Sequence, residues 1–195
     1  AASDVYKRQT KETADQIQQG IAKEILRFHV LANSDSEEDQ KLKLEVKDRL
    51  VDYMKDILDG AEDVKETKKR ITENQETICL VAEQEIQKQG YTYPVSVNLE
   101  KCYFPMKTYG DCTFPAGTYE ALRVCIGKAK GRNWWCVLYP GLCFADSVNV
   151  IVPDEKKQEL KNILTEEEYE SLFDWREDDY QIRSGFLRLW RKLFA

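Results

Sequence analysis

The sequence predicts an α+β fold: a small, mainly antiparallel sheet, two long antiparallel helices packed on one face, and a C-terminal helical tail. Apolar residues recur at helical spacing from residue 36 to residue 89, which predicts helices there. From Tyr93 the period changes to two, which is typical of strands with one buried face. Very few residues join the two predicted helices, and such short connections favour antiparallel neighbours.

Length and charge exclude several classes of protein. A chain of 195 residues is about one domain of ordinary size and can bury a core without help from metals. The formal net charge of -6 argues against a nucleic-acid binder, because such proteins usually carry a basic surplus. The sequence contains no apolar stretch of the roughly 18 residues that a transmembrane helix needs.

The first residues are not typical of a native N-terminus. Residues 3–9 read SDVYKRQ, which resembles the translation of a transposase adapter used in preparing sequencing libraries. We therefore expect residues 1–9 to be an artefact and residues 10–19 to be the remnant of an N-terminal linker. A native export signal or anchor is then expected to be missing from this chain.

The first half of the chain predicts one strand and the two helices. Residues 20–31 read GIAKEILRFHVL, and their apolar positions predict a strand, led in by a turn of helix. The polar stretch 32–40 favours a turn and a helix cap. The first helix then ends at Gly60, and a second helix over residues 62–89 ends at Gly90, because glycine commonly terminates helices.

The second half predicts two strands and the tail. Residues 95–100 and 119–126 alternate between apolar and polar side chains, as strands of one sheet do. Residues 102–117 between them are rich in Pro and Gly and predict a long hairpin connection. We therefore assign residues 20–150 to one domain and residues 151–195 to the tail.

The end of the tail predicts an amphipathic helix with a basic side. Its apolar residues follow helical spacing, and its basic residues occupy other faces. The apolar residues are Phe186, Leu189, Trp190, Leu193 and Phe194, and the basic residues are Arg183, Arg188, Arg191 and Lys192. Such a helix either docks on the domain or makes contact with a membrane surface.

Six cysteines and one histidine limit the metal chemistry. The chain has no CxxC pair, so the spacing of four-cysteine zinc ribbons and thioredoxin-type motifs is missing. We therefore expect no metal and no cofactor. Disulfides or scattered buried thiols remain, and disulfides would place the protein outside the reducing cytoplasm.

One cysteine pair stands out in the segment NWWCVLYPGLC at residues 133–143. Pro140 and Gly141 predict a turn, and a turn can bring Cys136 and Cys143 within the distance that a disulfide needs. We expect these two to form a disulfide that rigidifies the neighbouring tryptophans.

The other four cysteines leave their pairing open. Cys102 and Cys112 bracket the hairpin connection and can pair in the same way. Cys79 and Cys125 then remain, as a bridge between helix and sheet or as two buried thiols.

His29 allows an enzymatic interpretation beside a structural one. As a general base it would act with the Cys136 thiol or with a carboxylate, and Asn33 or Asp35 would orient its ring. The chain would then be an extracytoplasmic hydrolase. The structural interpretation is a histidine at a strand end, hydrogen-bonded to the nearby turn. A Cys–His enzyme also needs Cys136 free, which conflicts with the expected disulfide.

Three segments together resemble the stage II sporulation protein R family of endospore-forming bacteria. They are RFHVLANSDSEEDQKLKLEVKDRL, FPAGTYEALRV and GRNWWCVLYPGLCF. The resemblance covers residues 20–150, with a looser match in the tail. Gly141 stands where the family tends to show a second proline, and Cys79, Cys102, Cys112 and Cys125 lie outside the family's core pattern.

The resemblance implies a secreted signalling protein and not an enzyme. Family members are made in the forespore and exported into the space between forespore and mother cell. There they activate a membrane-embedded aspartic-type protease of the mother cell, which processes the precursor of sigma factor E. A purely structural extracytoplasmic domain is a further hypothesis.

Two segments are our candidates for contact with the protease. One is the turn RFHVLANSDS with Arg27, His29, Asn33 and Asp35, and the other is the loop with Arg132, Asn133, Trp134 and Trp135. Polar side chains on a turn and aromatic anchors beside a rigid link are what recognition requires. Burial of both tryptophans in the core is the alternative.

Overall fold

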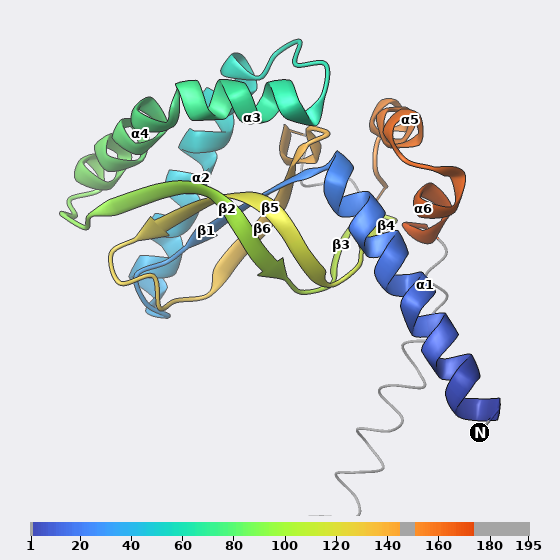
Figure 1. The fold of residues 1–195 in the computed structure, drawn as a ribbon. Coiled ribbons are helices and arrows are strands. Elements are labelled where there is room, and N and C mark those ends of the chain that lie inside the picture. Colours follow the sequence, from blue (N-terminus) through green and yellow to red (C-terminus); the bar gives the residue numbers. More distant parts are fainter. Residues whose placement is uncertain (1, 145–150, 174–195) are drawn as a thin grey trace, which may run out of the picture.

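The computed structural model describes residues 2–144 and 151–173, and it confirms the α+β class (Figure 1). The helices are α1 (Ala2–Glu24), α2 (Glu37–Ile57), α3 (Val64–Glu73), α4 (Gln75–Lys88), η1 (Leu142–Phe144), α5 (Asp154–Ile163) and α6 (Glu166–Ser171). The strands are β1 (Leu26–Leu31), β2 (Val95–Phe104), β3 (Lys107–Tyr109), β4 (Cys112–Phe114), β5 (Gly117–Ile126) and β6 (Asn133–Tyr139).

The main sheet has the strand order β2-β5-β1-β6. Strand β1 pairs in parallel with β5 and antiparallel with β6, while β2 and β5 are antiparallel. Two of the three pairings are therefore antiparallel, as predicted. All six residues of β1 are buried, because this strand lies inside the sheet and both of its faces are covered along most of their length.

One face of the sheet carries the main core, which α2, α3 and α4 cover (Figure 1). The strands contribute alternate residues to this face, and α2 contributes residues at helical spacing. Its fully or almost fully buried members include Phe28, Val30, Leu42, Val46, Leu50, Met54, Ile78, Leu122 and Val124. The first predicted helix and the alternation in the strands are thus confirmed.

The opposite face carries a second core at one end of the sheet. Helices α1, α5 and α6 gather there together with the β3–β4 hairpin (Figure 1). Its buried members include Ile21, Ile25, Phe104, Phe114, Tyr119, Val137, Leu160 and Leu172. These helices and the hairpin do not extend to the other end of this face, where β1 and β5 end and β6 begins.

The second predicted helix is two helices, because the chain breaks at Asn74. The Asn74 backbone N–H donates to the Arg70 and Ile71 carbonyls, and its side chain donates to the Arg70 carbonyl at 2.8 Å. Tyr53 of α2 donates its hydroxyl to Asn74 Oδ1 at 3.2 Å. An Asn side chain that competes for backbone groups favours such a break. Gly90 ends α4 with a φ of 85°, as expected.

Helix α1 is the largest departure from prediction. The sequence predicts a linker over residues 10–19 and only a turn of helix before β1, whereas the structure has one helix over Ala2–Glu24. The segment contains few large apolar residues. Ile21 and Ile25 nevertheless enter the second core, and Gln18 donates to the Thr118 carbonyl at 3.2 Å, so tertiary contacts fix this helix.

The long connection between β2 and β5 contains the β3–β4 hairpin, which the tail holds in place. Asp111 at the hairpin turn accepts the backbone N–H of Val152 at 2.9 Å and the Lys157 ammonium at 2.5 Å. The tail is helical over α5 and α6, whereas the predicted helix over residues 183–195 lies outside the described residues. No described helix is long and apolar enough to cross a membrane.

Candidate recognition surface

The two segments predicted for partner contact meet at one end of the sheet. We call this end the tip, and it consists of the turn at residues 32–36 and the loop at residues 127–132. Asn33 joins the two segments, since its Oδ1 accepts the Lys128 backbone N–H at 2.9 Å and its carbonyl accepts that of Lys130 at 3.2 Å. The Arg132 backbone N–H donates to Asp35 Oδ1 at 2.7 Å.

Two glycines allow this close approach. A Cβ on Gly131 would collide with the backbone of Ser34, and a Cβ on Gly127 would collide with the Asn33 side chain. Gly127 also has a φ of 58°, a conformation that favours glycine. Gly127 and Gly131 are therefore required for the packing of the loop against the turn.

Buried polar side chains of α2 form hydrogen bonds with the turn and the loop of the tip. Asp39, which is 5% exposed, accepts hydrogen bonds from the Asn33 amide at 2.8 Å and the Ser34 hydroxyl at 2.5 Å. Burial raises the pKa of the Asp39 carboxyl, but the hydrogen bonds from Ser34 and Asn33 outweigh burial and leave the pKa below its usual value. Lys43 donates to the Arg132 carbonyl at 3.1 Å. The turn and the loop thus share one support.

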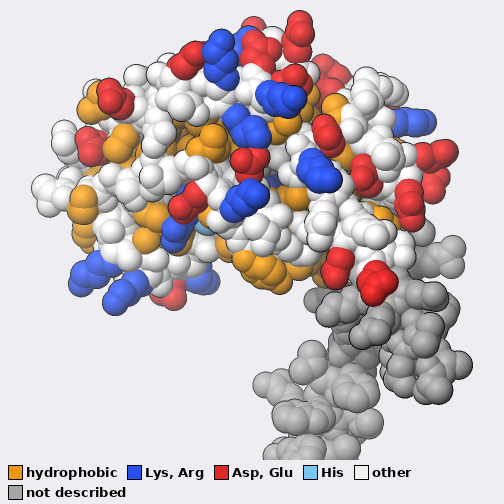
Figure 2. All heavy atoms as spheres, viewed as in Figure 1, with side chains coloured by type: hydrophobic (Ala, Val, Ile, Leu, Met, Phe, Trp, Pro, Cys, Tyr) orange, Lys and Arg blue, Asp and Glu red, His pale blue; other side chains and the backbone are white. Residues whose placement is uncertain are grey.

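The tip presents a basic surface on an acidic protein. Lys128, Lys130 and Arg132 are all exposed, and Lys and Arg side chains gather over the β5–β6 loop in Figure 2. Arg132 lies beside Asp35, with Nε 3.5 Å from Oδ1. Asp35 and the acidic first turn of α2 stand next to this basic loop, so the tip presents both signs of charge.

Next to the tip lies a part of the sheet that the second core covers only in part. The strand register places Asn98, Arg123, His29 and Trp135 in one row across all four strands, and Ser96, Cys125, Leu31 and Asn133 in the next row. We call these two rows the open face. Its members range from exposed at β2 to almost fully buried at β1. Its exposed and half-buried members on β2, β5 and β6 make it a candidate contact area.

His29 lies in the aromatic part of this face. Its ring stacks on Trp135, with ring centres 5.0 Å apart and planes 13° apart, and also contacts Phe104 at 5.0 Å. Burial lowers the pKa of His29 to about 4, and the nearby Arg123 charge lowers it further. Neither ring nitrogen has a hydrogen-bond partner among the described residues. His29 is therefore neutral at pH 7, and only 4% of its surface is exposed.

Arg27 is fully buried, so it is not available at the surface. Its Nε donates to the Cys136 carbonyl and its Nη2 to the Tyr109 hydroxyl, both at 3.1 Å. Its guanidinium carbon lies 4.4 Å from the ring centre of Phe104 and 4.9 Å from that of Tyr119, which are cation–π distances. Arg27 thus ties β1 to β6 and to the β3–β4 hairpin.

Trp134 and Trp135 point to opposite faces of the sheet, because successive residues of a strand alternate. Trp134 packs edge-on against Phe28 of the main core, with ring centres 5.5 Å apart. Lys47 of α2 lies over the Trp134 ring at 5.1 Å. Trp134 is therefore a partly buried core residue, whereas Trp135 belongs to the open face.

The structure brings together six of the eight predicted residues. Asn33, Asp35 and Arg132 form the tip, and His29, Asn133 and Trp135 lie on the open face. Sequence reasoning did not identify Arg123 or its ion pair with Glu100, whose atoms are 2.9 Å apart. The alternation in β2 and β5 places both residues on the polar side of their strands, but only the register shows that they meet.

The cysteines are thiols in this structure. Cys143 donates to the Val137 carbonyl at 3.0 Å, and Cys136 lies next to it. Burial raises the pKa of the Cys143 thiol well above its usual value, and a hydrogen bond with Cys136 raises it further. The two sulfur groups are thus neighbours, and their disulfide stays a prediction.

The other cysteines differ in their placement. Cys79 packs against the main core, whereas the strand register puts Cys125 on the opposite face of the sheet. A direct bridge between these two does not fit the structure, because the sheet separates them. Cys102 and Cys112 both belong to the second core, and their pairing stays a prediction.

The geometry does not support a Cys–His nucleophile. Trp135 lies opposite His29 and Cys136 lies opposite Phe28 in the β1–β6 register, so His29 and Cys136 point to opposite faces. In the described part of the chain, no group of three or more His, Cys, Asp or Glu side chains is placed to hold a metal ion. The tip and the open face are instead a surface suited to contact.

Comparison with known proteins agrees with the resemblance of the sequence motifs. The model of a family described as stage II sporulation protein R matches residues 22–149. The chain is also 33% identical over 171 residues to stage II sporulation protein R of Bacillus subtilis (strain 168), a match that covers 85% of this chain and 75% of that protein. No solved structure matches.

Proposed function

The chain belongs to the stage II sporulation protein R family, and from this premise we propose that it is a secreted intercompartmental signal of sporulation. It is made in the forespore, exported into the intermembrane space, and there activates a membrane-embedded aspartic-type protease of the mother cell. The protease then processes the precursor of sigma factor E. The chain itself acts by binding and not as an enzyme.

The tip is the observation that supports this proposal most directly. It projects from the end of the sheet, it is fixed by hydrogen bonds on both sides, and it carries the exposed side chains of Asp35 and Arg132 beside the half-buried Asn33. A rigid surface loses little conformational entropy on binding, which favours recognition. The open face extends the contact area beside it through Trp135, an aromatic residue of the kind that anchors interfaces.

Co-expression of this chain with the membrane protease and the sigma factor precursor tests the proposal. The readout is the fraction of precursor cleaved, compared with the same cells that lack the chain. Arg132→Glu reverses an exposed charge at the tip, whose side chain is 74% exposed. Lys69→Glu on α3 is a matched control, because its side chain is 73% exposed and the charge change is the same.

We expect cleavage to depend on the chain, to fall about tenfold or more with Arg132→Glu, and to remain unchanged with Lys69→Glu; such a loss is the size of a hot-spot effect. Cleavage that is independent of the chain would overturn the signalling function. Cleavage that depends on the chain but is unaffected by Arg132→Glu would instead move the contact surface away from the tip.

The oxidising setting of an exported protein also makes the Cys136–Cys143 disulfide part of the proposal. The link would join β6 to η1, on the side of β6 that packs against the main core. A thiol count on protein recovered from the intermembrane space tests it, and two alkylated sulfhydryls at these positions would contradict it.

A further inference from the structure

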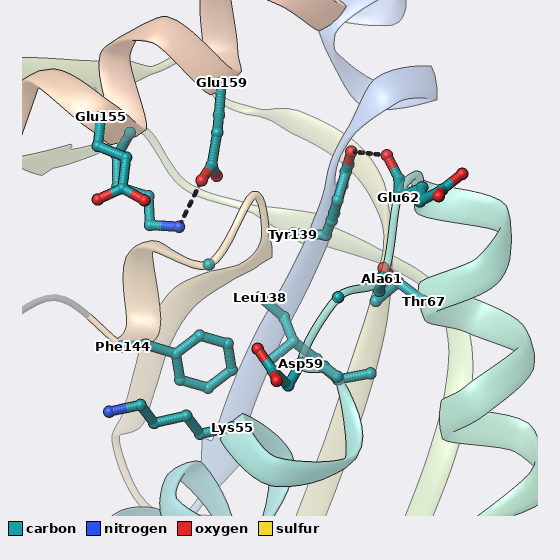
Figure 3. A pocket seen from close by; sticks show the side chains of 14 residues that line it. Lys55, Asp59, Ala61, Glu62, Thr67, Leu138, Tyr139, Phe144, Glu155 and Glu159 are labelled. Carbon is teal, nitrogen blue, oxygen red and sulfur yellow. Dashed lines mark hydrogen bonds and ion pairs between the residues drawn. The ribbon is translucent and has the colours of Figure 1, made fainter.

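A groove lies on the opposite end of β6 from the tip. It has a volume of about 550 Å³ and runs between the α2–α3 loop, the turn after β6, and α5 (Figure 3). Its apolar floor includes Leu58, Leu138 and Phe144. This volume falls in the range of pockets that take a ligand or a few large side chains.

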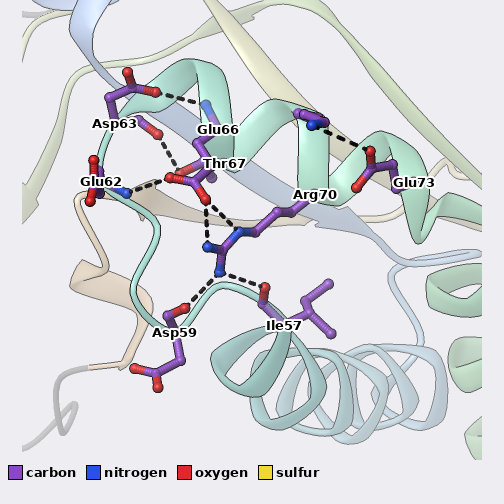
Figure 4. Close-up of polar contacts among 9 residues, drawn as sticks. Ile57, Asp59, Glu62, Asp63, Glu66, Thr67, Arg70 and Glu73 are labelled. Atoms are coloured by element: carbon purple, nitrogen blue, oxygen red, sulfur yellow. Dashed lines mark hydrogen bonds and ion pairs between the residues drawn. The ribbon is translucent and has the colours of Figure 1, made fainter.

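One wall of the groove is held rigidly by Arg70 (Figure 4). Arg70 Nη1 donates to the Asp59 carbonyl at 2.6 Å and to the Ile57 carbonyl at 3.3 Å. Its other nitrogens bind the Glu66 carboxylate, and Glu66 also accepts the Glu62 backbone N–H at 3.0 Å. The α2–α3 loop is therefore preformed as a binding wall.

The rim of the groove is acidic. It carries Asp59, Glu62, Glu155 and Glu159 against two lysines, Lys55 and Lys156. Lys156 is already paired with Glu159 at 2.7 Å, and no ion pair is found for Asp59, Glu62 or Glu155 within the described ranges. Burial raises the pKa of Tyr139 in the groove, and nearby carboxylates raise it further, which is consistent with a negative potential. The groove thus suits an apolar segment that carries positive charge.

The described chain ends beside α5, the helix that forms one wall of this groove. Phe173, its last residue, lies under Lys157 of α5, with Nζ 5.5 Å from the ring centre. Lys156, the neighbour of Lys157, lines the groove. Residues 174–182 can span up to about 30 Å when extended, which exceeds the roughly 10 Å diameter of a helix. This stretch is therefore long enough for residues 183–195 to reach the groove around α5.

Residues 183–195 have the matching chemistry. They read RSGFLRLWRKLFA, with four basic residues, no acidic residue and five large apolar residues at helical spacing. We propose that this segment docks in the groove, where one or two of its large apolar side chains contact the floor and its basic side chains face the rim carboxylates. The chain thereby supplies its own occupant for the groove.

Photo-crosslinking in the full chain tests this docking. Trp190→p-benzoylphenylalanine places a photoreactive group in the segment, and mass spectrometry then locates the crosslink. We expect an intramolecular crosslink to residues 55–62, 138–144 or 155–159. Leu44→p-benzoylphenylalanine, on an exposed position of α2, is the control and should not crosslink to these residues.

Charge reversal tests the rim. Glu62→Lys with Glu155→Lys should lower the crosslink yield about three- to tenfold, since each exposed charge pair contributes up to about a fivefold effect. Arg188→Glu with Arg191→Glu should restore the yield in that background. Asp52→Lys with Glu76→Lys makes the same charge change at exposed positions elsewhere and should leave the yield unchanged.

Three outcomes would overturn the proposal. One is a crosslink that joins two chains, because the segment would then dock on a second copy. Another is a crosslink to other parts of the same chain. The third is the absence of any crosslink while the full chain binds anionic vesicles. If Arg188→Glu with Arg191→Glu abolishes this vesicle binding, the segment contacts membrane and not the groove.

Discussion

Arg132 and Asp35 meet twice at the tip: the Arg132 backbone N–H donates to Asp35 Oδ1 at 2.7 Å, and the guanidinium Nε lies 3.5 Å from the same oxygen. One contact fixes the path of the loop, and the other depends on charge. Both side chains are largely exposed, so their attraction contributes little to stability. Their importance is in presenting the turn and the loop as one surface.

Asp35 variants can separate these two contacts. Asp35→Ala removes both and should lower the free energy of unfolding by about 0.5–1.5 kcal/mol, as for the loss of a hydrogen bond. Asp35→Asn keeps an acceptor for the backbone N–H and should lower it by less. Urea titration measures stability, and precursor cleavage measures activation. Equal activation by wild type and Asp35→Ala would show that the partner does not need this arrangement.

Gly131 should tolerate no side chain. Gly131→Ala brings a Cβ into the Ser34 backbone, and the required shift should lower stability by about 1–3 kcal/mol, as overpacking does. Ala129→Gly in the same loop is the control, because Ala129 has a φ of 51° that glycine adopts without strain. Thermal unfolding of both variants is the measurement, and a Gly131→Ala protein as stable as wild type would contradict the proposed packing.

His29 should make the protein less stable as the pH falls. The folded-state pKa of about 4 lies below the unfolded value of about 6.5, so below pH 6.5 the unfolded chain binds a proton that the folded chain does not. The free energy of unfolding should fall by about 3 kcal/mol between pH 6.5 and pH 4 from this group. Denaturant titrations across this range measure it.

His29→Phe is the matching variant, because it keeps an aromatic ring between Trp135 and Phe104. The difference in stability between wild type and variant should change with pH only below pH 6.5. The carboxylates that titrate in both proteins cancel in this difference. If the free energies of unfolding of the two proteins changed with pH in the same way, His29 would not be held neutral in the folded state.

The two tryptophans should respond differently to truncation. Trp134→Ala removes packing against Phe28 in the main core and should lower stability by about 2–4 kcal/mol, somewhat less than for a fully buried Trp. Trp135→Ala should lower activation more than its effect on stability explains. Cleavage assays at a temperature well below the melting temperature of each variant separate a loss of activation from a loss of stability. A Trp134→Ala protein with unchanged melting temperature and no activation would reverse these assignments.

The Cys136–Cys143 link can be tested on purified protein. Oxidation with oxidised glutathione should join the two sulfurs and raise the free energy of unfolding by about 2–3 kcal/mol on the chain-entropy model. Peptide mass mapping identifies the link, and Cys143→Ser should abolish the gain. Oxidation that joins other cysteines, or that lowers stability, would contradict the prediction.

Patterning in the sequence was sufficient for much of the fold. The spacing of Leu42, Val46, Leu50 and Met54 predicts α2 and its buried side, and the alternation in β2 and β5 predicts the face that meets the helices. The break at Asn74 was missed because the apolar positions continue on both sides of it. The parallel pairing of β1 with β5 was not predictable, since it depends on how distant segments associate.

The sequence indicated which candidate residues lie on turns, but not how those turns meet. Asn33, Asp35 and Arg132 were selected for their place on polar turns, and they do meet. Arg27 and His29 share the segment of Asn33, yet they lie inside strand β1, on the face opposite the main core, where neighbouring residues bury them. The β3–β4 hairpin covers Arg27, whereas Phe104 of β2 and Trp135 of β6 cover His29. None of these contacts could be read from the local sequence.

The position of β1 has a consequence for how the chain folds. Its neighbours β5 and β6 begin at Gly117 and Asn133, about ninety residues or more after β1 in the sequence. Closing such long loops is entropically unfavourable and slows assembly. A growing polypeptide that has not yet reached β5 lacks both partners of its innermost strand, so the main sheet can close only after roughly the first two thirds of the chain have been synthesised.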